Sequence, residues 1–147
     1  MAITSAICTS FKVEILKAVH NFTASSGNTF NLALYTSDAS LGASTTAYTT
    51  SNEVSGSGYT AKGNALTSVT PVADSTTAVC DFADTSFTSA SFTARGCLIY
   101  NTTSITGFTT NRAVCAINFG SDKTVTSGTF TIQFPAQTAG NAIIQIA

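Results

Sequence analysis

The stretch "RAVCAINFGSDKTVTSGTFTIQF", residues 112–134, decides the fold class. Apolar residues occupy alternate positions in two runs, first at Ala113, Cys115, Ile117 and Phe119 and then at Phe130, Ile132 and Phe134. A period of two places alternate side chains on the same face of a β-strand. Between the runs, "GSDK" (120–123) and "TSG" (126–128) have the composition of tight connections. The stretch therefore predicts two short strands, each with one buried face, separated by turns.

The same alternation recurs along most of the chain. It is present in "TFNLALY" (29–35), "TTAVCDF" (76–82) and "NAIIQIA" (141–147). The segment "FTARGCLIYN" (92–101) is apolar on both faces near Leu98 and Ile99, which favours a central strand. Short strands at this spacing predict a mainly β protein with a single domain over residues 1–147. We expect a β-sandwich or a jelly-roll-like barrel.

One segment near the N-terminus has helical periodicity instead. In "SFKVEILKAVHNF" (10–22), Phe11, Ile15 and Val19 recur at intervals of four residues. This spacing predicts an amphipathic helix over about residues 10–21. We expect the helix to dock on the β-domain through these three apolar side chains.

The composition excludes several kinds of partner. Lys and Arg number six against seven Asp and Glu, and 45 of the 147 residues are Ser or Thr. The six basic residues are scattered, so the sequence has no basic cluster of the kind that binds nucleic acid. No run of about 18 apolar residues is present, and we expect no membrane span. A weakly charged surface is poor at keeping protein molecules apart, which suits a subunit that packs against others.

No catalytic or metal-binding constellation is evident. His20 is the single histidine, and no nucleophile-elbow pattern accompanies it. The four cysteines have no C-x-x-C spacing; Cys80 and Cys115 lie on apolar strand faces and are expected to be buried thiols. Asp81 and Asp84 could hold a cation, although turn capping is the commoner role. We expect no enzyme, no cofactor and no metal site.

The longest stretch without periodicity is residues 37–57, which runs into the glycine-rich "VSGSGYTAKG" (54–63). A loop of this length inside a domain is usually functional or disordered. We predict a contact arm ordered against another subunit. Its apolar anchors would be Leu41, Tyr48 and Val54, Glu53 would pin it by accepting backbone N–H bonds, and Tyr59 would begin the next strand.

Four short segments together resemble a family of small structural proteins of tailed bacteriophages. The resemblance covers about residue 11 to the C-terminus. It rests on N-E-V-x-G-x-G-Y-T-A at 52–61, D-F-A-D at 81–84, A-R-G followed by L-I-Y-N at 94–101, and N-A-I-I at 141–144.

This resemblance implies a virion component made in the cytoplasm of the bacterial host. The location that we expect is the capsid surface, where the chain would act as a cement or decoration protein. Its partners would be the major capsid protein and copies of itself, arranged as a homotrimer. A tail, collar or head-fibre protein is the first alternative. The second is a surface carbohydrate-binding module, in which Tyr48 or Tyr59 would stack on a sugar.

Overall fold

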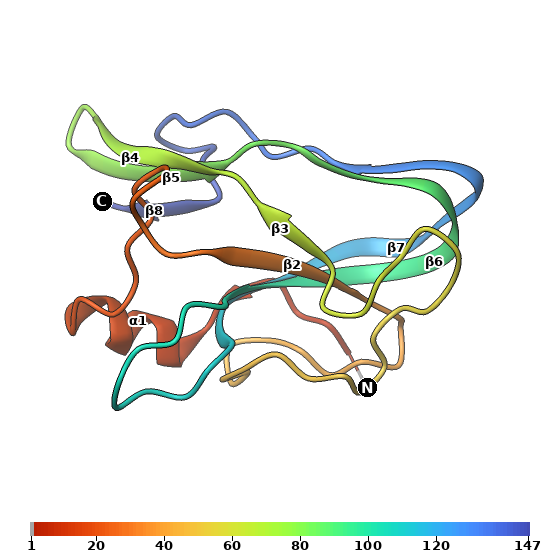
Figure 1. The fold of residues 1–147 in the computed structure, drawn as a ribbon. Coiled ribbons are helices and arrows are strands. Elements are labelled where there is room, and N and C mark those ends of the chain that lie inside the picture. Colours follow the sequence, from red (N-terminus) through yellow and green to blue (C-terminus); the bar gives the residue numbers. More distant parts are fainter. Residues whose placement is uncertain (1) are drawn as a thin grey trace.

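The computed structural model describes residues 2–147, which form two antiparallel sheets and one short helix (Figure 1). The first sheet has the strand order β1-β7-β6-β2-β3 and the second the order β4-β5-β8. In chain order the elements are β1 (Ala6–Ile7), α1 (Thr9–Leu16), β2 (Phe30–Tyr35), β3 (Asn64–Leu66), β4 (Ser68–Asp74), β5 (Thr77–Phe82), β6 (Thr85–Asn101), β7 (Arg112–Ile132) and β8 (Ile144–Ile146). The prediction of a mainly β fold with an N-terminal helix is confirmed. The two sheets form a sandwich and do not close into a barrel.

Strands β6 and β7 form one long ribbon that belongs to both layers. They pair along their whole length, from Asn101 opposite Arg112 to Thr85 opposite Ile132. The ribbon leaves the first sheet, curves and returns beside the second sheet (Figure 1). Along the curve the register breaks, so that residues 119–122 of β7 face the single residue Arg95 of β6.

This geometry corrects the prediction for residues 112–134. "GSDK" and "TSG" are bends within one strand of 21 residues and do not separate two strands. Gly120 adopts a φ of 81°, which a glycine reaches without strain. Extra residues on one strand of a pair bend it and increase its twist. Turn composition inside a strand therefore marks the place where the ribbon changes layer.

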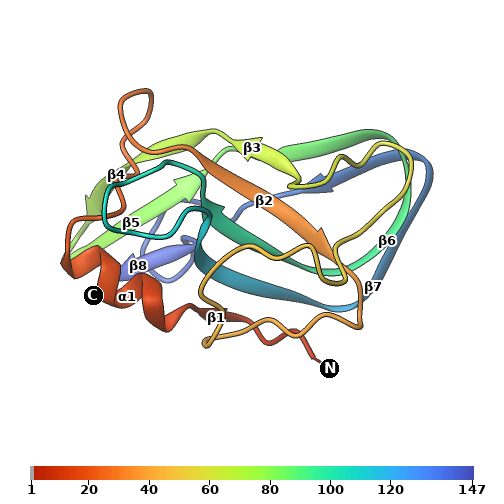
Figure 2. The ribbon, with the colours of Figure 1, turned by 60° about the horizontal axis from the view of Figure 1, so that its bottom comes forward.

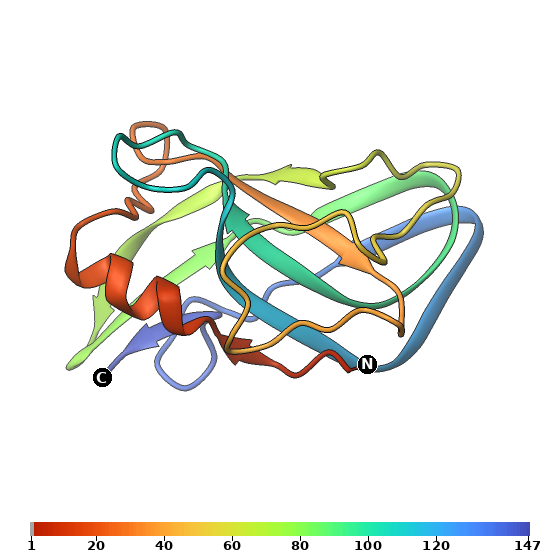
Figure 3. The same ribbon diagram turned by 90° about the horizontal axis from the view of Figure 1, so that it is seen from below.

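Helix α1 and residues 36–63 cover the outer face of the first sheet (Figures 2 and 3). The central strands are therefore buried on both faces, which explains why "GCLIY" in β6 lacks alternation. Leu32 and Leu34 of β2 and Leu98 and Ile99 of β6 are fully buried. The apolar core is one connected cluster of side chains.

The helix is shorter than predicted, ending at Leu16. The N–H of Ala18 donates to the carbonyl of Ile15 and the N–H of Val19 donates to that of Glu14, while Ala18 has a φ of 57°. These bonds form a Schellman turn, which ends a helix and reverses the chain. Val19 is buried although it lies beyond the helix, because this turn points it back toward the core. The four-residue spacing therefore predicted the burial of Val19 correctly. It placed Val19 in the helix, whereas the residue lies in the turn after Leu16.

All four cysteines are buried and unpaired. Burial raises the pKa of the Cys8 thiol to about 11 and that of Cys80 and Cys97 to about 12, so the thiols stay protonated at neutral pH. The prediction that Cys80 and Cys115 act as small buried side chains is confirmed.

Candidate interaction surface

Residues 36–63, which we call the pinned segment, are fastened by one carboxylate. Glu53 accepts hydrogen bonds from the hydroxyls of Tyr48, at 2.6 Å, and Tyr59, at 2.7 Å. It also accepts one from the backbone N–H of Lys62, at 2.7 Å. A carboxylate that accepts three bonds closes the segment on itself, since bonds to a charged acceptor are stronger than neutral ones. Glu53 thus accepts a backbone N–H as predicted, and it also joins the two tyrosines, which sequence reasoning did not foresee.

Both tyrosine rings pack against aromatic side chains of the sheet. Tyr48 stacks on Tyr100 with ring centroids 4.9 Å apart, and Tyr59 lies 5.5 Å from Phe87. Burial raises the pKa of both tyrosines, and the Glu53 carboxylate raises it further. The rings and hydroxyls are therefore already engaged within the chain, which speaks against their use as a sugar-stacking platform.

Two of the predicted anchors lie in the core. Leu41 and Val54 are each 4% exposed and belong to the central apolar cluster. The N–H of Val54 donates to the carbonyl of Leu34 in β2, and Leu41 bridges to Ile3. The expectation that Leu41 and Val54 anchor the segment on another subunit is wrong, because these side chains hold it on the sheet of the same chain.

The glycines allow this segment to approach the sheet closely. A methyl group on Gly58 would lie 2.5 Å from the carbonyl oxygen of Thr88 in β6. Nearby, the N–H of Ser91 in β6 donates to the carbonyl of Ser57. The pinned segment therefore contacts the edge of β6 at Ser91, beyond the residues of β6 that pair with β2.

Replacing Gly63 with alanine should destabilise the protein by about 1–3 kcal/mol. Gly63 has a φ of 70°, and a methyl group there would lie 1.8 Å from the carbonyl oxygen of Leu32 in β2. Urea denaturation would measure the loss. Gly107→Ala is the matched control, because Gly107 has a φ of 86° with nothing within 4 Å of the added methyl. Equal losses for the two variants would mean that backbone conformation, and not close approach, sets the requirement.

The helix docks mainly through Phe11. Its side chain is 2% exposed, and its ring lies 4.8 Å from that of His20 and 5.9 Å from that of Phe22. Ile15 is only partly buried against the core. Of the three predicted docking residues, Phe11 and Val19 are therefore buried and Ile15 lies at the margin.

A buried polar cluster joins the helix to the sheet, and sequence reasoning missed it. The Nε2 atom of His20 lies 2.7 Å from Oε2 of Glu14, and the Asn101 amide donates to Nδ1 of His20 at 3.0 Å. Arg112 is fully buried and donates to the carbonyls of Thr103 and Thr109. Its Nε lies 3.9 Å from the Glu14 carboxylate. An amide donor facing Nδ1 requires that nitrogen to accept, so His20 is neutral and donates through Nε2.

Stability should fall as the pH is lowered from about 7 to about 5. Burial lowers the pKa of His20 below its ordinary value of 6.5, against the opposing effect of Glu14. The unfolded chain therefore takes up the proton first, so stability is complete above pH 6.5 and is lost progressively below it. Urea midpoints across this range would measure the slope. His20→Gln should flatten it; an unchanged slope in that variant would assign the effect to another group.

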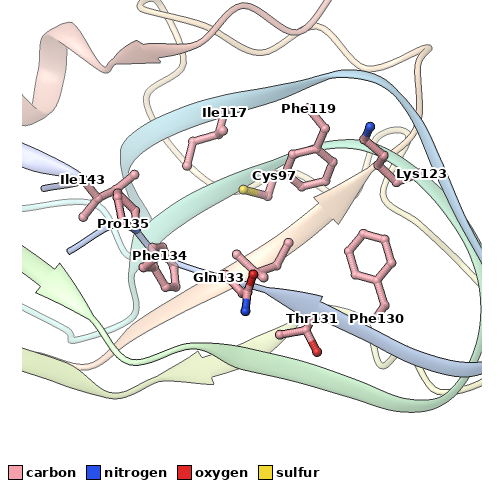
Figure 4. Close-up of a pocket in the computed structure, with 11 residues that line it drawn as sticks. Cys97, Ile117, Phe119, Lys123, Phe130, Thr131, Gln133, Phe134, Pro135 and Ile143 are labelled. Carbon is pink, nitrogen blue, oxygen red and sulfur yellow. The ribbon is translucent and has the colours of Figure 1, made fainter. Parts of the chain in front are cut away.

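An apolar groove lies inside the bend of β7 (Figure 4). It has a volume of about 520 Å³ and is lined by side chains from both halves of the strand. Six of these are large, apolar and only partly buried: Ile117, Phe119, Phe130, Ile132, Phe134 and Ile143. Lys123 is the one charged residue among those that line the groove. None of these residues was singled out from the sequence as a site, because the groove exists only where the ribbon folds back over itself.

The outward edge of β7 beside this groove is unpaired. Strand β1 covers only Ala116 and Cys115, and an isolated bridge joins Ala47 to Arg112. From residue 119 to residue 132, this edge pairs with no strand within residues 2–147; we call it the free edge. On the other edge of the ribbon, β2 pairs with residues 96–101 of β6 and the pinned segment bridges to Ser91, so that edge is partly covered.

In comparisons with known proteins, no protein-family model, curated protein or solved structure matches the chain. In the part of the chain that the structure describes, no helix is long and apolar enough to cross a membrane. Within residues 2–147, no three His, Cys, Asp or Glu side chains are grouped so that they could hold a metal ion.

Proposed function

We propose that the chain is a structural subunit of a tailed bacteriophage particle. Its preferred place is the outside of the capsid, as a cement or decoration protein that binds the major capsid protein and stabilises contacts between capsid subunits. The observation that carries this proposal is the free edge of β7 together with the apolar groove beside it. An unpaired strand edge attracts pairing with another chain, and native proteins usually protect such edges.

The remaining surface favours the same role. Strands β6 and β7 present threonine and serine hydroxyls that bond across the ribbon, for example between Thr93 and Thr124 at 2.8 Å. Hydroxyls supply many weak contacts to a neighbouring subunit without the cost of desolvating charges. Of the four segments that resemble phage structural proteins, residues 94–101 and 141–144 contribute Cys97 and Ile143 to the groove.

Attachment to particles tests the proposal. Particles that lack this protein would be mixed with the purified chain, and the bound copies would be counted by quantitative mass spectrometry. We expect saturation at hundreds of copies per particle, as a capsid location requires. Saturation at a dozen or fewer copies would favour the alternative of a tail, collar or head-fibre protein. Failure to attach to any part of the particle would refute the virion role.

A further inference from the structure

The free edge of β7 runs beside the groove, and the two offer complementary kinds of contact. The free edge presents backbone N–H and C=O groups between residues 119 and 132 that have no strand partner within the described chain. The groove presents Phe130, Ile132 and Phe134, which occupy alternate positions on the inner face of the ribbon. Thr131 and Gln133, which alternate with them, are exposed and also line the groove.

We propose that this site binds an extended segment of a different protein, which adds as a strand to the free edge of β7. The segment would carry apolar side chains at alternate positions and an acidic residue near Lys123. This inference rests on the proposed function, because it names the chemistry by which a neighbouring virion subunit would be held. Strand addition combines main-chain hydrogen bonds with pockets for alternate side chains.

The period of the strand accounts for the apolar alternation. A strand paired with residues 123–132 would extend about 30 Å and contain about ten residues. Every second side chain would point to the inner face of the ribbon and enter the groove. There it would meet aromatic rings that are already close together, since Phe130 lies 5.2 Å from Phe92 and 6.3 Å from Phe119. The partly exposed rings would then lose their remaining contact with water.

The charge at the groove accounts for the acidic residue. Lys123 is exposed and, within residues 2–147, forms no ion pair with a carboxylate of the chain. The adjacent Asp122 does not neutralise it, because its carboxylate accepts a bond from Arg95 at 2.7 Å. A partner that places a carboxylate beside Lys123 would therefore complement the single charge of the groove.

Two synthetic peptides test the inference on the full-length protein. Each peptide has ten residues. Isoleucine and threonine alternate between the two terminal residues, which are both glutamate in one peptide and both lysine in the other. Binding would be measured by titration calorimetry, and hydrogen exchange would follow the backbone amides of residues 119–132. We expect the glutamate peptide to bind at least about tenfold more tightly than the lysine peptide. We also expect it to slow the exchange of amides on the free edge.

Charge reversal provides the matched variants. Lys123→Glu should invert the preference between the peptides, while Lys12→Glu, the same change on the exposed face of α1, should leave it unchanged. Both sites are exposed, so neither variant should compromise folding. The inference is wrong if Lys123→Glu leaves the preference between the peptides unchanged, or if the bound peptide does not slow exchange of the amides of residues 119–132. It is also wrong if neither peptide binds.

The oligomeric state decides between a foreign segment and a second copy. If sedimentation shows that the chain alone is a dimer or trimer and its free-edge amides are already protected, the occupant is another copy and the inference is wrong. A monomeric chain whose free-edge amides exchange rapidly supports the inference of a foreign segment. The particle-attachment experiment is independent of these results, so the peptide inference can fail while the virion role stands.

Discussion

Replacing Arg112 with methionine is expected to destabilise the protein by about 3–5 kcal/mol, because it breaks a buried charged network while nearly preserving volume. The guanidinium is fully buried, 3.9 Å from the Glu14 carboxylate, and donates to two loop carbonyls. Removing it leaves those carbonyls and Glu14 without their cation. The free energy of unfolding from urea denaturation would measure the effect.

Arg95→Met is the control for that experiment. Arg95 also forms an ion pair, with Asp122 at 2.7 Å, but both side chains are substantially exposed. Exposed pairs contribute about 0–1 kcal/mol, so this variant should be almost as stable as the parent. If Arg112→Met lowers the free energy of unfolding by no more than Arg95→Met does, the buried polar cluster does not stabilise the docking of the helix and of residues 102–111.

Phe30→Ala is expected to cost a similar amount, about 3–5 kcal/mol, by leaving a cavity in the aromatic part of the core. Phe30 is fully buried, and its ring stacks on Phe22 with centroids 4.4 Å apart and an angle of 7° between ring planes. It also meets the edge of Phe82 at 5.6 Å. These rings connect β2 with β5 of the second sheet and with the chain that follows the helix.

Leu16→Ala is a suitable comparison because Leu16 is 89% exposed. It removes a large apolar side chain from the surface and should change stability by less than about 0.5 kcal/mol. Thermal or urea unfolding of both variants would measure the difference. A small loss for Phe30→Ala would mean that the neighbouring rings close the cavity, which the near-parallel stacking of Phe22 and Phe30 opposes.

Alternation of apolar residues predicted strands within β2, β5, β6, β7 and β8, because burial on one face leaves a direct trace in the sequence. It predicted none of β1, β3 and β4, in which no residue is fully buried. It failed at two places where the chain changes direction within an apolar pattern. At Ala18 a Schellman turn ends the helix while Val19 still packs inward. At residues 119–122 a bulge bends β7 without ending it. In both cases the hydrophobic pattern predicts which side chains are buried. It does not predict whether the backbone there continues as a helix or strand or turns.

The candidate site was less predictable because its parts are distant in the sequence. Glu14 and Arg112 meet only through the docking of the helix on β7, and Ile117 faces Phe130 only because the ribbon curves. Glu53 was recognised as a pin because it is the one acid in a long neutral stretch. Its tyrosine partners lie close to it in sequence, but their hydroxyls could equally have faced solvent or a ligand.

The continuous β6–β7 ribbon also determines how the molecule would carry mechanical load. In a sandwich of separate sheets, a force that pulls the layers apart is resisted by side-chain packing alone. Here the same two covalent backbones run through both layers (Figure 1). A force directed along the ribbon loads its interstrand hydrogen bonds in shear, so that many must break together. The layers are therefore tied together at the curve, where the two strands pass from one layer to the other.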